Sequence, residues 1–468
     1  MAISTRLSAS LSPANESVLD LIGNTPMVRV RNLDTGPCEL FLKLESQNPG
    51  GSIKDRIALS LVTAAEQSGA LKPGGILVEA TAGNTGLGLA LIASQKGYGL
   101  KLVIPDKMSQ EKVFHLKALG AEVILTRSDV GKGHPDYYQD RARRLAEETP
   151  GAFYVNQFEN PANPATHENG TGPEIWAQLD HRLDAVVCGV GSGGTLTGLG
   201  RFFARVAPHV EMILADPKGS ILAPFVEHGV MIEPGSWLVE GIGEDFIPKN
   251  CELSFVKRAY TVTDAESIAM ARETLRREGI LCGSSSGTMM AAALRYCRAQ
   301  TEPKRVVSFV CDSGNKYLSK IYNEYWLDDQ GFVERVPAND LRDLIARPYL
   351  RGQAIIAAPD DALQQVYAKM KTFDISQLPV MEHGGVVGMI DEMDILMTVT
   401  GNDKGFAIPA RTVMSTKLVT LEADRSLEDL AAVLARGLVG CIMDKQQFLG
   451  LITPADFLNY LRKRTGKA

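Results

Sequence analysis

The 468-residue chain lacks the long apolar run that a membrane-spanning helix requires, since none of its hydrophobic stretches approaches about 18 residues. The first 16 residues are polar and serine-rich, without the apolar core of a secretion signal. Excess positive charge is also missing: the formal net charge is −6, whereas a nucleic-acid surface needs clustered basic side chains. We therefore expect neither a membrane protein nor a nucleic-acid partner.

Cysteine is sparse and scattered along the chain. The seven cysteines include no C-x-x-C pair, which is the spacing typical of structural zinc sites and redox dithiols. An odd, dispersed set of thiols in a long chain is typical of reduced cysteines in the cytoplasm. We expect a cytoplasmic protein without a metal site.

The composition, with 45% hydrophobic and 22% charged residues, is that of a globular protein of two or three domains. From residue 17 to about 330, short apolar runs alternate with helical patterns. This alternation predicts an α/β fold whose mainly parallel strands are covered by helices. The expected strands are 40–44, 75–79, 102–105, 121–125, 185–190, 212–215 and 306–310, and the expected helices include 84–95, 110–119 and 137–148.

The texture changes near residue 331, where a short polar stretch predicts a linker. Beyond it, two pairs of segments resemble each other at an offset of 62 to 64 residues: 359–363 with 423–427, and 387–394 with 449–456. A repeat of this size with a β-α-β-β-α texture indicates two small modules that bury their faces against each other. The expected divisions are a main domain over 1–330, a linker over 331–345, and modules over 346–402 and 409–466.

The stretch 48–56 joins an expected strand to the apolar helical pattern 57–62. One proline and two glycines break the chain before Lys54, which places that lysine at a helix start, where unpaired N–H groups favour anions. A partly dehydrated lysine can lose its proton and act as an amine nucleophile. A surface lysine after a strand–helix turn is the plainer alternative, which the stretch alone favours.

Three further loops each join a strand to a helix. Residues 189–195 are rich in glycine, so their backbone N–H groups can converge on one anion, although the spacing is neither the dinucleotide fingerprint nor a P-loop. Residues 79–86 offer two threonine hydroxyls and an asparagine amide, which suit a carboxylate. Residues 283–287 offer serine hydroxyls that suit a pyridine nitrogen. For the last two loops, simple N-capping is the alternative.

Together the four loops resemble those of the pyridoxal-phosphate enzymes of the cysteine synthase and cystathionine β-synthase family, which have fold type II. The resemblance covers about residues 17–325, and all four loops occur in the family's order. It implies that Lys54 forms the Schiff base with pyridoxal 5′-phosphate and that Asn84 hydrogen-bonds the cofactor's ring hydroxyl. It also implies a phosphate cup of Gly191, Ser192, Gly193, Gly194 and Thr195, with Ser285 as partner of the ring nitrogen. The substrate residues implied in the same way are Thr81, Ala82, Thr85, Gln157, Gly241, Ile242 and Glu244.

The family resemblance implies β-replacement on an amino acid, in which the released Lys54 amine takes the α-proton. A serine at the ring nitrogen makes the ring a milder electron sink than an aspartate would, which favours expulsion of a β-substituent over transamination. Glu244 and Asp245 stand where cysteine synthases have small residues, and their charge favours the ammonium of homocysteine over sulfide; solvated loop charges are the plainer alternative.

We therefore expect a bacterial-type enzyme, without the N-terminal haem-binding extension, that condenses L-serine with L-homocysteine to L-cystathionine and water. Release of hydrogen sulfide from cysteine is an expected side activity. Two alternatives stay open: an O-acetylserine sulfhydrylase with a regulatory tail, and a nucleotide-sensing protein with a degenerate enzyme domain.

Residues 346–464 resemble a pair of the regulatory modules named after cystathionine β-synthase, repeats of a kind that bind adenosyl nucleotides. In the second module Thr453 and Asp456 match the positions that contact the ribose, whereas in the first Asp391 replaces the usual serine or threonine. The resemblance therefore implies at most one effector per chain, S-adenosylmethionine or an adenine nucleotide. It also implies a homodimer or homotetramer.

Overall fold

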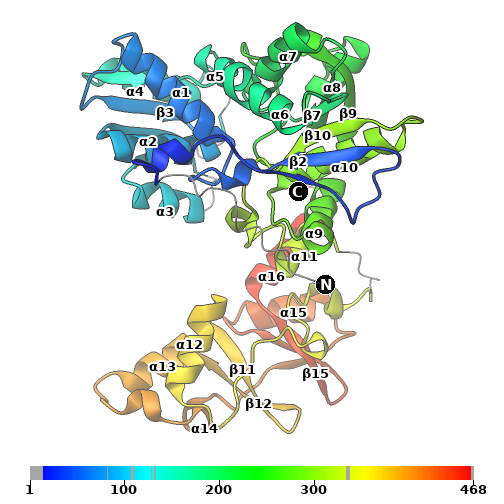
Figure 1. Cartoon of the computed structure of the whole chain (residues 1–468). Coiled ribbons are helices and arrows are strands. Elements are labelled where there is room, and N and C mark those ends of the chain that lie inside the picture. The colour runs from blue at the N-terminus through cyan, green and yellow to red at the C-terminus, as the bar shows by residue number, and fades with distance from the viewer. Residues whose placement is uncertain are drawn as a thin grey trace. The chain divides into compact units, whose positions relative to one another are not determined.

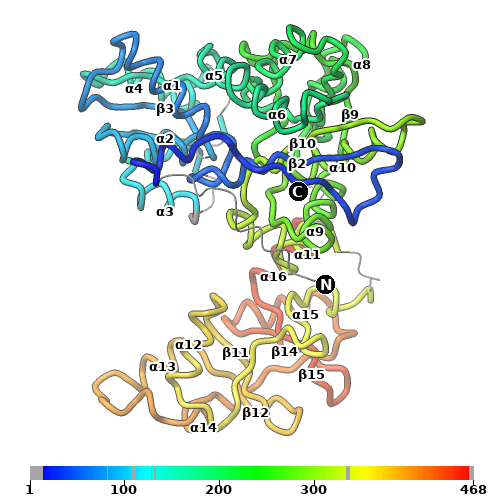
Figure 2. The backbone as a smooth tube through the Cα atoms, in the orientation of Figure 1, coloured from blue at the N-terminus to red at the C-terminus, as the bar shows by residue number. Residues whose placement is uncertain are grey.

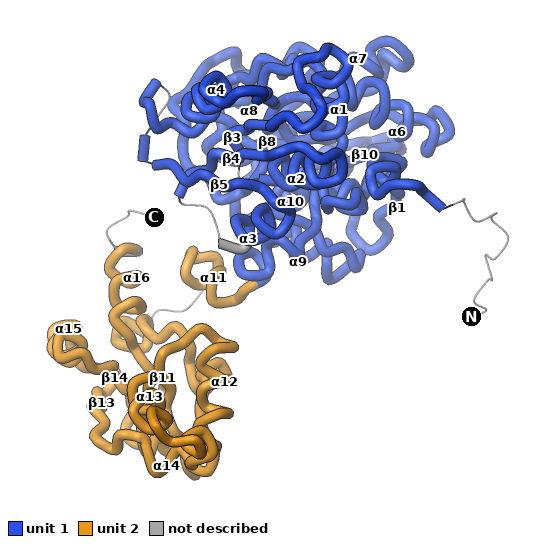
Figure 3. The backbone as a smooth tube through the Cα atoms, turned by 90° about the vertical axis from the view of Figure 1, so that its left-hand side faces the viewer, with its two compact units in different colours: residues 1–322 blue, residues 323–468 orange. Residues whose placement is uncertain are grey.

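The computed structural model describes residues 14–81, 83–106, 110–127, 129–130, 133–333 and 338–464. It consists of two compact units, Met1–Tyr322 and Asn323–Ala468 (Figure 3). The boundary between the units therefore lies slightly before residue 330, the position that the change in sequence texture had predicted.

The larger unit contains two sheets (Figure 1). The six-stranded sheet has the spatial order β1 (Met27–Arg29), β2 (Glu39–Lys43), β10 (Arg305–Phe309), β7 (Ala185–Cys188), β8 (Glu211–Pro217) and β9 (Val256–Val262). The four-stranded sheet has the order β5 (Glu122–Thr126), β4 (Gly99–Pro105), β3 (Ile76–Ala80) and β6 (Ala152–Tyr154). All the pairings in these sheets are parallel except that of β1 with β2. The expected α/β class with mainly parallel strands is confirmed.

Helices lie between the strands along the chain (Figure 1). The helices of the larger unit are α1 (Lys54–Gln67), α2 (Asn84–Lys96), α3 (Gln110–Ala118), α4 (Tyr138–Glu148), α5 (Ala162–Thr166), a π-helix (His167–Thr171), α6 (Gly172–Gln178), α7 (Gly194–Val206), α8 (Leu222–His228), α9 (Asp264–Glu278) and α10 (Ser284–Arg298). Short 3-10 turns cover Val18–Leu21, Glu45–Gln47, Leu253–Phe255 and Gly314–Tyr317.

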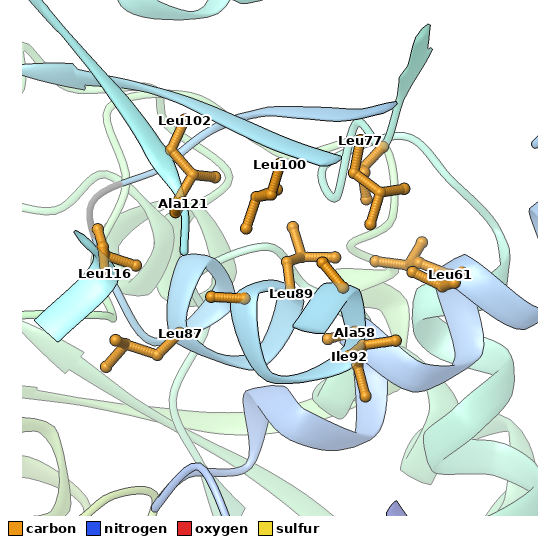
Figure 4. Packing of buried hydrophobic residues seen from close by; sticks show 14 of the residues in the cluster. Ala58, Leu61, Leu77, Leu87, Leu89, Ile92, Leu100, Leu102, Leu116 and Ala121 are labelled. Carbon is orange, nitrogen blue, oxygen red and sulfur yellow. The ribbon is translucent and has the colours of Figure 1, made fainter. Parts of the chain in front are cut away.

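The core of the four-stranded sheet fixes the start of α2. Leu89 and Ile92 of α2 belong to one buried cluster with Leu77 of β3 and Leu100 of β4 (Figure 4). Burying a leucine or isoleucine side chain contributes about 1.5–3 kcal/mol, so this packing holds α2 firmly against the sheet. Because α2 begins at Asn84, the packing also positions this residue relative to the end of β3.

The six-stranded sheet brings together segments that are far apart in sequence. The chain path in Figure 2 places β2 beside β10, with Leu40 paired to Val306 and Leu42 to Ser308. The backbone N–H of Ile53 also donates to the carbonyl of Cys311 over 2.8 Å. The segment before Lys54 is therefore attached to the chain that leaves β10.

The smaller unit contains two similar halves. The first half has α12 (Leu363–Phe373), β11 (Gln377–Glu382), β12 (Gly385–Asp391) and α13 (Glu392–Val399), followed by α14 (Ala410–Val413). The second has β13 (Thr420–Glu422), α15 (Leu427–Leu434), β14 (Gly440–Asp444), β15 (Gln447–Ile452) and α16 (Pro454–Arg464). The second half follows the expected β-α-β-β-α order, whereas in the first the initial strand is reduced to a single bridge between Ala357 and Val380.

Part of the expected linker belongs to the smaller unit's core. Residues 334–337 lie outside the described residues, but Leu341–Leu344 form a 3-10 turn. Leu341, Leu344 and Ile345 are buried in one cluster with Leu430 of α15. The unit also contains α11 (Glu324–Asp329) and 3-10 turns at Tyr349–Arg351 and Gly405–Ala407. Three apolar side chains within a polar stretch thus attach this segment to the second module.

The described helices include none that is long and apolar enough to cross a membrane. All seven cysteines are free thiols, and six of them are buried.

Candidate functional site

A cavity of about 250 Å³ in the larger unit collects the four loops. Its walls come from the segments that follow β3 and β6 in one sheet, those that follow β2, β7 and β10 in the other, the loop between α8 and β9, and the start of α10. Every expected cofactor and substrate residue that the structure describes lines it: Lys54, Thr81, Asn84, Thr85, Gln157, Gly191, Ser192, Gly193, Gly194, Thr195, Gly241, Ile242, Glu244 and Ser285. Ala82 lies outside the described residues, and Asp245 is exposed and is not part of this lining.

Lys54 is the first residue of α1, which has no side-chain cap. Burial lowers the pKa of its ammonium group, and the acidic groups Cys311, Glu244 and Asp312 would oppose this shift only in their ionised forms. A lowered pKa raises the fraction of neutral amine, which is the nucleophilic form of lysine. The geometry therefore supports a reactive amine and not a solvated surface lysine.

Three helix N-termini at the cavity are uncapped by side chains. The N-cap positions of α2, α7 and α10 are Gly83, Gly193 and Gly283, and none of them makes a side-chain cap. The structure thus contradicts simple capping as the explanation for the polar side chains of these loops. The first-turn N–H groups of an uncapped helix remain available to an anionic ligand.

The glycine loop before α7 leaves no room for a side chain at Gly191 or Gly194. A Cβ at Gly191 would lie 2.6 Å from the carbonyl oxygen of Gly241, and one at Gly194 would lie 1.9 Å from Oδ1 of Asn163. The Ser192 hydroxyl accepts from Asn163 Nδ2 at 2.9 Å. Glycine is therefore required here because the surrounding chain approaches the loop backbone closely.

His167 stands behind the glycine loop. Its Nε2 lies 3.2 Å from the Thr195 hydroxyl and its Nδ1 lies 2.9 Å from the Thr171 hydroxyl. Burial lowers the pKa of His167 well below its usual value, so the ring is neutral. Neither His167 nor Asn163 was predictable from the sequence, since neither stands in a recognisable spacing relative to the loop.

Ser285 differs from the serines on either side of it. The Ser284 hydroxyl accepts from the backbone N–H of Glu240 at 3.1 Å, and the Ser286 hydroxyl accepts from that of Cys311 at 3.0 Å. Among the described residues, none forms a hydrogen bond with the Ser285 hydroxyl, and this residue lines the cavity. Ser285 is therefore the serine of this loop with a hydroxyl to offer a ligand.

The side chain of Asn84 is held at both ends. Its Nδ2 donates to Asp312 Oδ2 at 2.7 Å, and its Oδ1 accepts from Lys316 Nζ at 2.7 Å. Tyr317 donates to the same Asp312 oxygen at 2.6 Å. One N–H of the amide remains for the cavity. Asp312 was not among the predicted site residues, although a carboxylate just beyond an apolar parallel strand lies at the sheet edge where ligands bind.

Glu244 and Asp245 have different surroundings. Glu244 lines the cavity, and its burial, reinforced by the negative charges of Asp245 and Asp216, raises its pKa well above the usual value. Asp245 is exposed. A single acid therefore faces the cavity from this loop, and its surroundings favour its neutral form.

These groups fit pyridoxal phosphate, the cofactor that the family resemblance implies. The amine of Lys54 suits its aldehyde, and the N-terminus of α7 with Ser192 and Thr195 suits its phosphate. The free Ser285 hydroxyl and the remaining Asn84 N–H suit its ring nitrogen and ring oxygen. Among the described residues, no group of three or more histidine, cysteine, aspartate or glutamate side chains could hold a metal ion.

The smaller unit has a cavity of about 590 Å³ lined by both halves. Thr453 and Asp456 line it, together with Asp374 and Gln377 from the first half. Their side chains also bond each other, because Asp456 Oδ2 accepts from the Thr453 N–H and hydroxyl, each at 2.7 Å. Asp391 caps α13 in the same way with Asp394. The capping role of these residues is thus visible in both halves.

Comparison with known proteins gives two family matches. The model described as pyridoxal-phosphate dependent enzyme matches residues 18–312, and the CBS domain model matches residues 341–401 and 410–463.

Several curated proteins and solved structures are similar to the chain. A cystathionine beta-synthase of Apis mellifera is 40% identical over 327 residues, covering 69% of this chain and 64%, slightly less than two thirds, of that protein. A cystathionine beta-synthase of Dictyostelium discoideum is 35% identical, and the match covers 97% of this chain and 93% of that protein. Cysteine synthase 1 of Neurospora crassa is 41% identical, covering 68% of this chain and 85% of that protein. The solved structure of a hydrogen sulfide-producing enzyme from Fusobacterium nucleatum has a TM-score of 0.61 at 36% identity, covering 65% of this chain and 100% of its own.

Proposed function

Because the chain belongs to the family of pyridoxal-phosphate dependent enzymes and also carries paired CBS domains, we propose that it joins L-serine to L-homocysteine, giving L-cystathionine and water. The observation that carries this proposal is the single cavity in which Lys54 meets the glycine loop, Ser285 and the Thr85–Gln157 pair. Near-full-length similarity to a cystathionine beta-synthase supports it. The complete set of cavity residues argues against a degenerate enzyme domain.

Bound pyridoxal phosphate would supply an electron sink that acidifies the α-carbon of an amino acid and lets a β-substituent leave. Lys54 would contribute its neutral amine, first to hold the cofactor aldehyde and then to take the α-proton at Nζ. The Ser285 hydroxyl would face the ring nitrogen without delivering the full charge of a carboxylate. The uncapped start of α7, with Ser192 and Thr195, would hold the phosphate.

The substrate's α-carboxylate would lie against the uncapped start of α2. There Thr85 Oγ1 donates to Gln157 Oε1 at 2.7 Å, which leaves the amide N–H groups of Gln157 for a ligand. Thr81 and the neighbouring backbone complete this wall of the cavity. Glu244 would receive the ammonium group of homocysteine, since an arriving cation favours the ionised carboxylate.

A second candidate function is O-acetylserine sulfhydrylase, favoured by the similarity to a cysteine synthase over the larger unit. Hydrogen sulfide release from cysteine with homocysteine is a further expected reaction, since a thiolate can also leave the β-carbon. A panel of serine, O-acetylserine and cysteine, each with homocysteine and with sulfide, tests the proposal. Fastest turnover with serine and homocysteine supports it, and fastest turnover with O-acetylserine and sulfide supports the second candidate.

We further propose that the 590 Å³ cavity of the smaller unit takes one adenosine-containing effector, with Thr453 and Asp456 at its ribose. S-adenosylmethionine is the first candidate, because it reports flux in sulfur metabolism, and an adenine nucleotide is the second. Calorimetry with both, on wild type and Asp456→Ala, tests this. Absence of binding at millimolar concentration contradicts it and leaves assembly as the role of the unit.

The remaining features of the proposal concern assembly, location and haem. We propose a homodimer or homotetramer, supported by exposed Met393, Leu396 and Met397 on one helix of the smaller unit. Seven free thiols support a cytoplasmic location. We propose catalysis without haem, and an absorption spectrum of the purified protein tests that directly.

A further inference from the structure

Glu79 is a fully buried carboxylate that no step described above uses. It is 1% exposed and lies near the end of β3, two residues before Thr81. Its Oε1 accepts from the backbone N–H of Ala80 at 2.9 Å, and its Oε2 accepts from that of Gln157 at 3.2 Å. The backbone N–H of Asn156 also stabilises the carboxylate. Burying a charge costs free energy even when it is hydrogen-bonded. A buried carboxylate at this position therefore points to a role in the fold or in the site.

Glu79 lies where the pairing of β3 with β6 stops, although the pairing of β3 with β4 continues to Ala80. The pairing of β3 with β6 runs from Ile76 to Val78, and the last ladder bond is from the Val155 N–H to the Val78 carbonyl at 3.0 Å. Beyond it the two chains separate into the loops that line the cavity, and Asn156 takes a positive φ of 51°. The Glu79 side chain therefore replaces the missing ladder bonds and bridges the two loops.

Gln157, at the other end of this bridge, connects the residues proposed to bind the substrate's α-carboxylate with those proposed to bind the phosphate. Its side chain accepts from Thr85, and its carbonyl accepts from Asn163 Nδ2 at 2.7 Å. Asn163 in turn donates to the Ser192 hydroxyl at 2.9 Å. A displacement of Gln157 would therefore directly change the part of the cavity proposed to bind the α-carboxylate.

We propose that Glu79 is a positioning residue whose negative charge holds the Thr81–Thr85 loop and Gln157 together as one binding wall for the substrate's α-carboxylate. This inference rests on the proposed function, since it concerns the same substrate site. Loss of the charge, by protonation or by substitution, would relax the wall and weaken amino-acid binding without removing the cofactor.

The surroundings place the ionisation of Glu79 in an accessible range. Burial raises its pKa to about 7, against the hydrogen bonds that favour the charge. The ionisable group that interacts with the charge of Glu79 is Tyr154 of β6, which burial keeps neutral, and Arg143, Glu159 and Asp140 act on Tyr154 in turn. The carboxylate predominates above pH 7 and the neutral acid below it. Substrate binding should therefore weaken as the pH falls through 7.

The test is a titration of the full-length holoenzyme with L-serine between pH 6 and pH 8, followed by cofactor absorbance. Glu79→Gln mimics the neutral acid, so its apparent dissociation constant should exceed that of wild type about tenfold at pH 8 and by only about twofold at pH 6. The ratio of the two constants cancels the ionisation of serine itself. Cofactor content should be equal in both proteins.

Glu278→Gln is the matched control, because Glu278 also accepts from backbone N–H groups, those of Arg31, Asn32 and Leu33, but is remote from the cavity lining. It should show the wild-type pH dependence. Glu79→Asp keeps a titratable carboxylate and supplies a second variant. Its dissociation constant should lie between those of wild type and Glu79→Gln at pH 8, and the constants should converge at pH 6. If the ratio of the Glu79→Gln dissociation constant to that of wild type does not change with pH, the inference about Glu79 is wrong, whereas the proposed function is unaffected. A wild type that never responds to serine overturns the proposed function, and the inference with it.

Discussion

Lys54 and Glu244 share one cavity, and burial moves their pKa values in opposite directions. The pKa of the Lys54 ammonium is lowered and that of the Glu244 carboxyl is raised, so both shifts favour the uncharged form. An uncharged amine is ready to bond a carbonyl carbon, whereas an uncharged acid becomes charged only when a cation arrives. The two residues are thus suited to different tasks, one to the cofactor and one to the second substrate.

Replacing Lys54 with alanine should abolish turnover, because no other residue is proposed to supply the amine that holds the cofactor and moves the α-proton. Borohydride reduction of the wild-type holoenzyme followed by peptide mapping should place the pyridoxyl label on Lys54. Lys96→Ala, which alters a lysine paired with Glu66 away from the cavity, should leave activity unchanged. A label on a different lysine would contradict the assignment.

Replacing Glu244 with alanine should weaken the use of homocysteine more than the use of sulfide. A hydrogen bond to a charged partner contributes about 1.5–3 kcal/mol, which corresponds to roughly tenfold to a hundredfold in kcat/KM for homocysteine. Asp245→Ala is the comparison at the neighbouring position, which is exposed and outside the lining; it removes a charge that raises the pKa of Glu244 but leaves the acid that lines the cavity in place. Equal losses with both thiols would mean that Glu244 shapes the cavity without selecting the thiol.

At the scale of the element, α1 is held by a buried ionic network two residues beyond Lys54. The Arg56 guanidinium lies 2.7 Å from Glu45 and 2.7 Å from Glu174, and Lys43 lies 2.8 Å from Glu174. Arg56 and Glu45 are almost fully buried. The network connects α1 to the chain after β2 and to α6, and thereby fixes the helix whose first residue is Lys54.

Arg56→Met should destabilise the protein by about 3–5 kcal/mol, because it leaves buried carboxylates without their cation. Urea unfolding of the full-length chain measures the change. Lys96→Met breaks a partly exposed pair with Glu66 and should cost at most about 1 kcal/mol. Comparable losses of unfolding free energy in the two variants would show that water solvates the carboxylates once the Arg56 charge is removed.

The strands that sequence analysis found are those with continuous apolar runs, and the ones that it missed lack such runs. Residues 185–188 are fully buried and apolar, whereas β9 alternates and has exposed lysine and arginine, and β1 and β6 have only three residues each. The division into two sheets also escaped prediction. An apolar run shows that a strand is buried, but it does not show which sheet contains the strand.

The candidate site was predictable where a loop has its own local chemistry, as the glycines of 191–194 do. The partners behind these loops were not, because they come from distant parts of the chain. Asn84 meets Asp312 and Lys316 across more than 200 residues of sequence. No periodicity or spacing encodes such a contact, which depends on how β3 and β10 are placed by their sheets.

At the scale of the whole molecule, the boundary between the units decides which fragment is self-contained. Helix α11 lies before residue 330 but belongs to the smaller unit. Asp329 in α11 pairs with Arg462 of α16 at 3.1 Å, and the Tyr325 ring lies 4.9 Å from the Arg347 guanidinium. A fragment that ends at 330 therefore keeps α11 without these partners.

A chain truncated after Tyr322 should fold, bind pyridoxal phosphate and turn over, because every described residue of the catalytic cavity lies before that position. A chain truncated after residue 330 should have the same active site but lower solubility, since it exposes the apolar side chains of α11, among them the buried Leu327. Gel filtration, cofactor content and serine–homocysteine turnover of both fragments measure the difference. Any response to an adenosine-containing effector should be absent from both fragments, because Thr453 and Asp456 have been removed. An inactive 1–322 fragment that retains its cofactor would instead make the smaller unit a requirement for catalysis and not only its regulator.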